Sequence, residues 1–466
     1  MASVSAEDSA LVRGVDDLVS VFHAAEKPAA RFLLGAEAEK FAVHAETFAP
    51  LGYDGEHGVV RVLEALTRYG WQREVEVEGG SLVALRRGSA SITLEPAAQL
   101  ELSGAALPDV HAVSAEFDQH LAELRPISED MHLVWLGAGF QPLASRAELP
   151  WVPKQRYPIM REYLPTRGSA AHDMMLRTAT VQVNLDYASE ADAMRKLRVG
   201  LLLSPLLNAL TANSPFVEGR RGGKKSLRGN VWLNMDPARS GLVRRVLEHR
   251  HARYHDYAEW ALDAGMFLFK RNGKVTANTG QTFRDFMNNG FGNERATLGD
   301  WKLHLNTLFP EVRLKNTIEL RSCDALPHAL TPAVSALAAG LFYDERALIE
   351  AEALALSLGL DAVERARPEL VTHALGASIA GLPARALAEQ LLELARGGLE
   401  RRARLDANGA SEAIFLEPLQ ALVQAGLSPA DLLLEGLTGD GPFPASELIA
   451  RCAIERSVEP RPLAAR

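Results

Sequence analysis

Glu37 and Glu39 lie two residues apart, directly after the apolar run 32–34. In a β-strand, residues i and i+2 point to the same face, so these two carboxylates would project side by side. Like charges that close raise each other's pKa unless a cation lies between them. A solvated sheet face also carries alternating glutamates, so the pair alone is compatible with a surface strand and with a cation site.

Three further strand-like runs (92–103, 177–187 and 317–321) present polar faces of the same kind. Their alternating polar side chains are Thr93, Glu95, Gln99, Glu101, Ser103, Thr178, Thr180, Gln182, Asn184, Asp186, Thr317, Glu319 and Arg321. A wet face of an antiparallel sheet would explain each strand by itself. Together, however, the faces are dense in oxygen ligands and poor in cations apart from Arg321, and such oxygens are the ligands that Mg²⁺ or Mn²⁺ prefers. A carboxylate-rich sheet beside separate arginines suits an ATP-dependent site.

The composition limits the class of protein. The 466 residues are 47% hydrophobic and 23% charged, as in ordinary globular proteins. The net charge of -9 argues against a nucleic-acid binder. The two cysteines, Cys323 and Cys452, form no disulfide or zinc pattern. No targeting segment or membrane span is indicated, so we expect a cytoplasmic protein without a membrane or nucleic-acid partner.

Strands and helices are mixed up to about residue 324, and adjacent strands are joined by short turns that favour antiparallel pairing. From Ala325 onwards the composition shifts to Ala, Leu, Glu and Arg with helical spacing and no fixed repeat. This order of elements predicts an α+β protein. We expect a catalytic core over 1–324 and a helical C-terminal region over 325–466 that packs on the core.

Four segments carry more specific expectations. Residues 92–102 and 312–321 are each expected to form one strand. Residues 74–78 alternate ahead of Gly79-Gly80 and are expected to form a solvated edge hairpin. The basic, glycine-rich segment 218–230 is not a Walker A motif, and it is equally compatible with a solvated loop and with a phosphate-binding loop.

Six groups of residues carry a resemblance to a known family. They are, in order, 35–41 (GAEAEKF), 93–96 (TLEP) with 99–103 (QLELS), 156–160 (RYPIM), 180–186 (TVQVNLD), 213–216 (NSPF) with 218–220 (EGR), and 318–321 (IELR). Over about residues 30–345 the chain resembles the plant and proteobacterial type of glutamate–cysteine ligase, within the glutamine synthetase-like carboxylate–amine ligases. The resemblance implies a curved antiparallel β-sheet funnel flanked by helices, with the site on the concave face. It also implies ATP-dependent formation of γ-glutamylcysteine through a γ-glutamyl phosphate, the first step of glutathione synthesis.

The same resemblance implies roles for particular residues. Arg321, Glu37 and Glu319 would be catalytic, Arg156 and Arg228 would bind the glutamate carboxylates, and Arg321 with Lys225 would contact ATP. Mg²⁺ (or Mn²⁺) would be held by Glu37, Glu39, Glu95, Glu101, Gln182 and Glu319. The division expected is Glu39, Glu95 and Glu101 on one ion, with Glu37, Gln182 and Glu319 on another.

The expected partners are small molecules, namely L-glutamate, L-cysteine and ATP, and the protein is expected to be a monomer or homodimer. The alternative is a related ligase that joins glutamate to a different amine. A non-catalytic metal-binding protein would not need Arg321, and a hydrolase with paired carboxylates would not need the set of arginines. Plant members of the family use cysteine pairs for redox control, whereas nothing pairs Cys323 with Cys452. We therefore expect thiol-independent activity.

Overall fold

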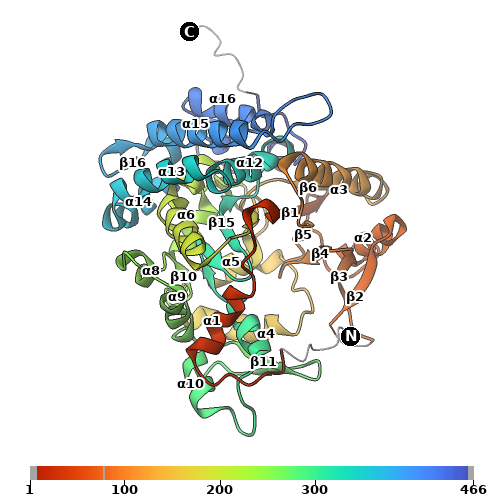
Figure 1. Cartoon of the computed structure of the whole chain (residues 1–466). Coiled ribbons are helices and arrows are strands. Elements are labelled where there is room, and N and C mark those ends of the chain that lie inside the picture. The colour runs from red at the N-terminus through yellow and green to blue at the C-terminus, as the bar shows by residue number, and fades with distance from the viewer. Residues whose placement is uncertain (1–7, 77–78, 460–466) are drawn as a thin grey trace.

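The computed structural model describes residues 8–76 and 79–459, and an antiparallel sheet lies at its centre (Figure 1). The strands follow the order β14-β15-β7-β1-β5-β4-β3-β2, and β6 pairs with β1. They are β1 (Leu34–His44), β2 (Gln72–Val75), β3 (Leu82–Arg87), β4 (Ala90–Leu94), β5 (Leu100–Ser103), β6 (Leu133–Leu136), β7 (Thr180–Leu185), β14 (Val312–Leu314) and β15 (Ile318–Asp324). Every pair in this sheet is antiparallel.

The long strand β1 holds the sheet together because it pairs with three strands. Its first half pairs with β7 on one side and β5 on the other, and its last four residues pair with β6. Small apolar residues alternate with the glutamates of β1, and Ala36 and Ala38 are buried on the opposite face. The alternation therefore separates a core face from a polar face, as a strand with a period of two requires.

Helices α3 (Val110–Asp130), α6 (Glu190–Leu210) and α12 (Thr331–Phe342) contact the sheet through β1, β15 and β7. Every residue of α12 is buried, so this helix is part of the core rather than a surface layer. Polar caps fix the starts of the other two helices, because the Asp109 carboxylate accepts the Ala112 N–H at 2.9 Å and Ser189 Oγ accepts the Asp192 N–H at 3.3 Å.

Further helices and short paired strands lie outside the large sheet. They are α4 (Arg156–Tyr163), α5 (Ala171–Arg177), α7 (Leu227–Leu233), α8 (Arg244–Glu248), α9 (Tyr254–Leu262), α10 (Phe283–Asn289) and α11 (Leu298–Leu305), with β8 (Phe216–Val217), β9 (Arg220–Arg221), β10 (Ser240–Gly241), β11 (Leu268–Arg271), β12 (Lys274–Ala277) and β13 (Phe309–Pro310). Helices α1 (Val15–His23) and α2 (Val59–Leu66) lie outside this group, and α1 packs on α9 and α11.

The C-terminal region forms a helical layer above α6 and the sheet, coloured blue in Figure 1. Its elements are α13 (Glu345–Leu358), α14 (Leu360–His373), β16 (Ser378–Ile379), β17 (Leu382–Pro383), α15 (Ala384–Arg402), α16 (Glu417–Gln424), α17 (Pro429–Leu434) and α18 (Ala445–Cys452). Helices α12 and α15 approach so closely that a Cβ on Gly398 would lie 2.0 Å from the Gly340 carbonyl oxygen. The Gly137 N–H donates to the Cys452 carbonyl at 2.9 Å, so the end of this region is also tied to the chain beside β6. The division at residue 324 remains a prediction.

The predicted α+β fold with a large antiparallel sheet is confirmed, but two predicted strands are wrong in detail. Residues 92–102 form two strands, β4 and β5, because the chain turns over 95–99 with Ala98 at φ 63°. Residues 312–321 likewise form a hairpin of β14 and β15 that turns at 315–317. In each hairpin, polar residues lie opposite each other on the two strands, as Thr93 does with Glu101 and Arg313 with Glu319. The predicted polar face is therefore present although each run forms two strands.

The run 74–78 agrees with the expected solvated edge hairpin at Glu74 and Val75, which lie in the exposed edge strand β2 paired with β3, and departs from it at Glu76. Strand β2 ends at Val75, and the Glu76 carboxylate accepts the Gln155 N–H at 2.8 Å instead of facing solvent alone. Residues 77 and 78 lie outside the described residues. The basic segment 218–230 contains the end of the β8–β9 hairpin and the start of α7 rather than a single loop.

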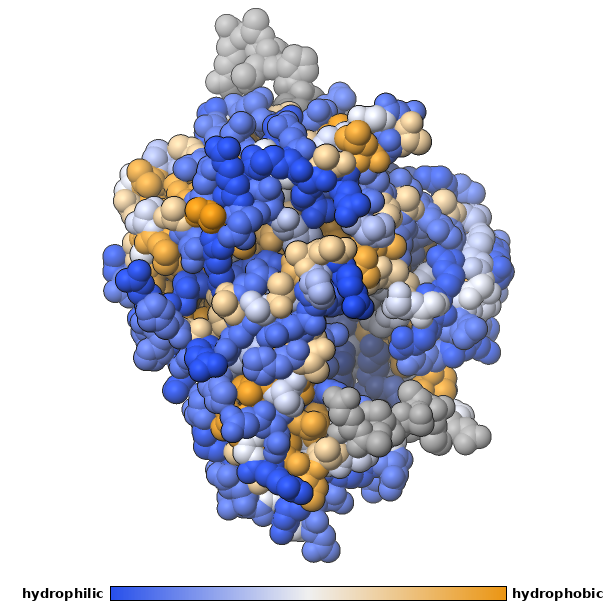
Figure 2. All heavy atoms as spheres, in the orientation of Figure 1, coloured by the Kyte–Doolittle hydropathy of each residue, from blue (hydrophilic) through white to orange (hydrophobic). Residues whose placement is uncertain are grey.

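No helix within 8–76 and 79–459 has the length and apolar composition needed to cross a membrane. On the face drawn in Figure 2, hydrophilic residues predominate and hydrophobic ones are scattered.

Candidate active site

Strand register brings the predicted carboxylates onto one face. Glu39 lies directly opposite Glu101 on β5, and Glu101 lies opposite Thr93 on β4. The Thr93 hydroxyl donates to Glu101 at 2.5 Å. On the other side of β1, Glu37 lies opposite Gln182 on β7, whose side-chain amide donates to it at 3.2 Å. The oxygen-rich faces predicted for separate strands therefore form one continuous surface.

Three of these carboxylates lie beside other negative charges, Glu101 buried and Glu37 and Glu39 half-buried. Burial raises the pKa of Glu37 to about 8, with further contributions from Glu319 and Glu101. Burial and the charges of Glu95 and Glu101 raise the pKa of Glu39 well above its ordinary value. Burial and Glu95 likewise raise the pKa of Glu101. A divalent cation would remove the cost of ionising these groups, so their chemistry fits a hard metal ion.

Glu319 differs because cations surround it. Its two oxygens accept bonds from the Arg313 guanidinium at 2.8–3.0 Å, and Lys315 Nζ lies 2.8 Å from Oε2. Arg321 also pairs with Glu319. Although burial alone would raise the pKa of Glu319, Arg313, Lys315 and Arg321 hold it well below its ordinary value.

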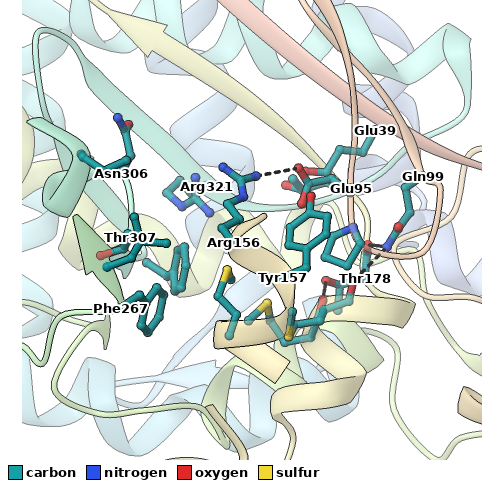
Figure 3. Close-up of a pocket in the computed structure, with 18 of the residues that line it drawn as sticks. Glu39, Glu95, Gln99, Arg156, Tyr157, Thr178, Phe267, Asn306, Thr307 and Arg321 are labelled. Carbon is teal, nitrogen blue, oxygen red and sulfur yellow. Dashed lines mark hydrogen bonds and ion pairs between the residues drawn. The ribbon is translucent and has the colours of Figure 1, made fainter. Parts of the chain in front are cut away.

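The predicted arginines lie beside the acids but have different partners. Arg321 donates to the Gln182 side-chain oxygen at 2.5 Å. Arg156 Nη2 lies 3.8 Å from Glu95 Oε1, and Figure 3 shows Arg156 and Arg321 close to Glu39 and Glu95. Arg228, on α7, is buried and donates to the carbonyl oxygens of β15.

A cavity of about 210 Å³ opens in front of Glu39 and Glu95 (Figure 3). Its cationic lining comes from Arg156, Arg228, Arg321 and Lys270, and the apolar wall is formed by Tyr157, Met160, Met174, Met175, Trp232 and Phe267. Glu76 also lines it. The cavity thus combines planar guanidinium groups, which form bidentate hydrogen bonds with carboxylates, with an apolar wall that limits access of water.

A second cavity, of about 770 Å³, is lined by Lys27, Arg31, Lys302 and Lys315, with Glu26 as its acidic residue. Val21, Ala25 and Leu33 supply apolar surface. Asn306 lines both cavities, and Lys315 connects the second cavity to Glu319. An acidic sheet face therefore lies next to two cavities with cationic linings.

The structure does not bring every predicted residue together. Lys225 forms an ion pair with Asp431 of α17 at 2.7 Å, and it lines neither cavity. Gln182 bridges Glu37 and Arg321. Within the described ranges, no three His, Cys, Asp or Glu side chains already converge as a metal site.

Sequence reasoning missed Arg313, Lys315 and Asn306. Arg313 and Lys315 alternate within 312–316 in the same way as the acids, which was a signal that they share a face. No motif indicates Asn306.

Acids on a sheet, flanked by arginines and by two cationic cavities, are a combination that suits a carboxylate-activating ligase. The sequence comparisons agree. The chain matches the glutamate–cysteine ligase family 2 over residues 33–456. The chain therefore belongs to that family.

Individual relatives give the extent of the similarity. The chain is 38% identical to the chloroplastic glutamate–cysteine ligase of Brassica juncea over 429 residues, which span 91% of this chain and 81% of that protein. It is 39% identical to the chloroplastic glutamate–cysteine ligase B of Oryza sativa subsp. japonica, over 90% of this chain and 83% of that protein. A solved structure of glutamate–cysteine ligase from Francisella tularensis in complex with AMP is 10% identical, with a TM-score of 0.45 over 87% of this chain and 84% of that one.

Proposed function

We propose that this protein is an ATP-dependent glutamate–cysteine ligase that forms γ-glutamylcysteine. The observation that carries the proposal is the buried acidic face beside two cationic cavities. A reaction that first phosphorylates a carboxylate needs one site for the acid, one for the nucleotide, and neutralised phosphates between them.

Glutamate would bind in the smaller cavity. Arg156 is half exposed there, with a side chain that is 47% accessible, and its guanidinium is available for an incoming carboxylate. Arg228 lines the same cavity although two of its nitrogens already donate to backbone carbonyls. We therefore assign the main carboxylate contact to Arg156 and a supporting contact to Arg228.

ATP would bind in the larger cavity. Lys27, Arg31 and Lys315 supply positive charge for the phosphates, and Val21, Ala25 and Leu33 supply apolar surface for the base. Lys315 and Arg321 now neutralise Glu319, and both are cations that a transferring phosphoryl group would attract. This assignment replaces Lys225 by Lys315 as the lysine at the phosphates.

We assign the metal ligands as Glu39, Glu95 and Glu101 for one ion and Glu37, Gln182 and Glu319 for another. Electrostatic neighbourhoods separate Glu95, which acts on Glu39, from Glu319, which acts on Glu37, whereas Glu101 acts on both. Bound Mg²⁺ would neutralise the phosphate oxygens and polarise the phosphorus for attack. Glu319 would take part after Lys315 and Arg321 turn towards phosphate.

The residues of the chain then divide the work. Arg156 would hold glutamate with its γ-carboxylate towards the acidic face, where a carboxylate oxygen attacks the γ-phosphorus and ADP leaves. The cysteine amine attacks the acyl carbon, the C–N bond forms, phosphate leaves and the amine loses a proton. The methionine and aromatic wall of the smaller cavity would keep water from the acyl phosphate and suits the small thiol side chain.

ADP release with Mg²⁺, glutamate and ATP across a panel of amines tests the proposal. Release that depends on cysteine supports it. Release with a different amine alone would indicate a related ligase, and no release with any amine would refute ligase activity. The cytoplasmic location and the monomeric or homodimeric state stay predictions, and the two plant relatives named above are chloroplastic.

A further inference from the structure

An ion pair joins the C-terminal helical region to the edge of the active site. Arg367 of α14 pairs with Glu311, which lies between β13 and β14. Both side chains are largely buried, with 15% and 17% of their surfaces accessible. Ion pairs in this environment fix geometry more than exposed pairs do, because each partner loses its water and depends on the other.

Glu311 supports an irregular part of β15 through its backbone. Register with β7 shifts between Leu320 and Cys323, so Arg321 and Ser322 leave the regular ladder. The Glu311 carbonyl accepts the Arg321 N–H at 3.1 Å and the Ser322 hydroxyl at 3.3 Å. The position of Glu311 therefore sets the path of the chain at Arg321.

Arg321 and Ser322 also hold the Arg228 side chain through their backbone carbonyls. Its guanidinium donates to the Arg321 carbonyl at 2.7 Å and to the Ser322 carbonyl at 3.2 Å. Arg228, Glu311, Ser322 and Arg367 line one small cavity, and Arg228 also lines the 210 Å³ cavity in front of Glu39. A shift of Glu311 would thus move both Arg321 and Arg228.

Helix α14 also fixes the start of α7, which carries Arg228. The Val371 carbonyl accepts the N–H groups of Lys225 and Ser226, both at 3.0 Å. A Cβ on Gly229 would lie 2.7 Å from Val371 Cγ1, so the two helices pack without a gap. Helix α14 therefore positions Arg228 in two ways: through Glu311 and the backbone of β15, and through Val371 and the start of α7.

We propose that Arg367 is a positioning residue that sets glutamate affinity by fixing Arg228 through Glu311. The inference rests on the proposed function and gives the C-terminal region a role in positioning substrate-binding groups. A guanidinium suits this position because its planar fork loses little freedom when it pairs. Small displacements of substrate-binding groups reduce binding and rate strongly, because the productive geometry is narrow.

The test compares Arg367→Met with Glu364→Gln. Glu364 lies on the same helix and pairs with Arg244, but at a more exposed position, with 32% of its side chain accessible. Steady-state ADP release gives separate KM values for glutamate and ATP, and thermal unfolding reports on the fold. We expect Arg367→Met to raise the KM for glutamate roughly tenfold with a much smaller change in the KM for ATP, whereas Glu364→Gln leaves both unchanged.

Arg367→Lys and Glu311→Gln complete the experiment. Arg367→Lys should recover part of the glutamate affinity, and Glu311→Gln should raise the KM for glutamate in the same direction if Arg367→Met fails to fold. Equal rises in both KM values, or an unchanged KM for glutamate in folded Arg367→Met or Glu311→Gln, would overturn the inference. If the wild-type protein itself releases no ADP with any amine, the proposed function fails instead, which is a separate result.

Discussion

Arg313 binds both carboxylate oxygens of Glu319, at 2.8–3.0 Å, from the neighbouring strand of the sheet. The two residues lie directly opposite each other, so the hairpin β14–β15 brings its own cation to the acid. The charge of Glu319 is therefore compensated, whereas burial and the charges of Glu319 and Glu101 outweigh Lys315 at Glu37 and raise its pKa.

This difference predicts that Glu37→Gln and Glu319→Gln have unlike effects on stability. Both should nearly abolish ADP formation. Glu319→Gln should lower the free energy of unfolding by about 3–5 kcal/mol, because it leaves Arg313 and Lys315 buried without their partner. Glu37→Gln should leave it unchanged or raise it, because a neutral amide avoids the cost of either protonating or ionising a carboxyl group at this position. Denaturant unfolding monitored by circular dichroism measures the change.

The matched control is Glu74→Gln on β2, where the glutamate pairs with Arg86 at an exposed position. It should change neither activity nor stability. Equal stability losses in Glu37→Gln and Glu319→Gln would contradict the charge assignment, and near wild-type turnover in either would remove that residue from the metal set.

A pH dependence follows from the raised pKa of Glu37. In the folded protein this pKa is about 8, against an ordinary value of 4.5. Between these values the folded state holds a proton that the unfolded state has released, so the free energy of unfolding should fall as pH rises from about 4.5 to 8. Calorimetry of the metal-free protein should show a Tm that declines over this range, with a smaller decline in Glu37→Gln.

The effect of Mg²⁺ on Tm should also depend on pH. Protons compete with Mg²⁺ for these carboxylates, so added Mg²⁺ should raise Tm more near pH 8 than near pH 6. Excess chelator should abolish the difference. A Mg²⁺ effect that is the same at both pH values would argue against carboxylates with raised pKa as the ligands.

The polar face could be predicted because strand periodicity is a local property. Side chains at every second position of a strand point to the same face, and paired residues on neighbouring strands share that face. One surface therefore carries Glu37, Glu39, Glu101 and Gln182. The turn over 95–98 had one signal, because proline favours the second position of a β-turn and Pro96 stands there, but the positive φ of Ala98 gives no glycine or asparagine signal.

Partners distant in sequence were also beyond prediction. Nothing in the sequence indicates that Lys225 pairs with Asp431, about two hundred residues away, or that Arg367 reaches Glu311. Such pairs depend on how the C-terminal helices pack on the sheet, which is set by the whole core. The basic character of 218–230 was visible, but its partners were not.

Substitution of Arg156 should separate substrate binding from folding. Arg156→Ala should raise the KM for glutamate at least about tenfold, because a charge-assisted contact to a carboxylate is lost. Tm should hardly change, since Arg156 is half exposed. Arg161→Ala is the control, because Arg161 lies on the same helix and stacks on Trp151 away from the cavity lining. Steady-state kinetics should show an altered KM only for Arg156→Ala.

Activity should not respond to thiol redox conditions. Cys323 and Cys452 are both buried and free, and burial raises the pKa of each thiol to about 11. Neither thiolate is available for exchange at neutral pH. ADP release should be the same with and without dithiothreitol, and after treatment with oxidised glutathione. Loss of activity on mild reduction would show that a disulfide supports the active form.

Lys315 and Lys225 should differ in their effect on ATP. Lys315 lines the larger cavity beside Glu319, whereas Lys225 pairs with Asp431 outside both cavities. Lys315→Met should raise the KM for ATP roughly tenfold, because a charged contact to phosphate is lost. Lys225→Met should leave this KM unchanged. Each variant removes one lysine from an ion pair, so the Tm values of the two variants show whether either substitution destabilises the fold. A rise in the KM for ATP with Lys225→Met alone would return the nucleotide contact to the basic segment 218–230 and would place ATP outside the larger cavity.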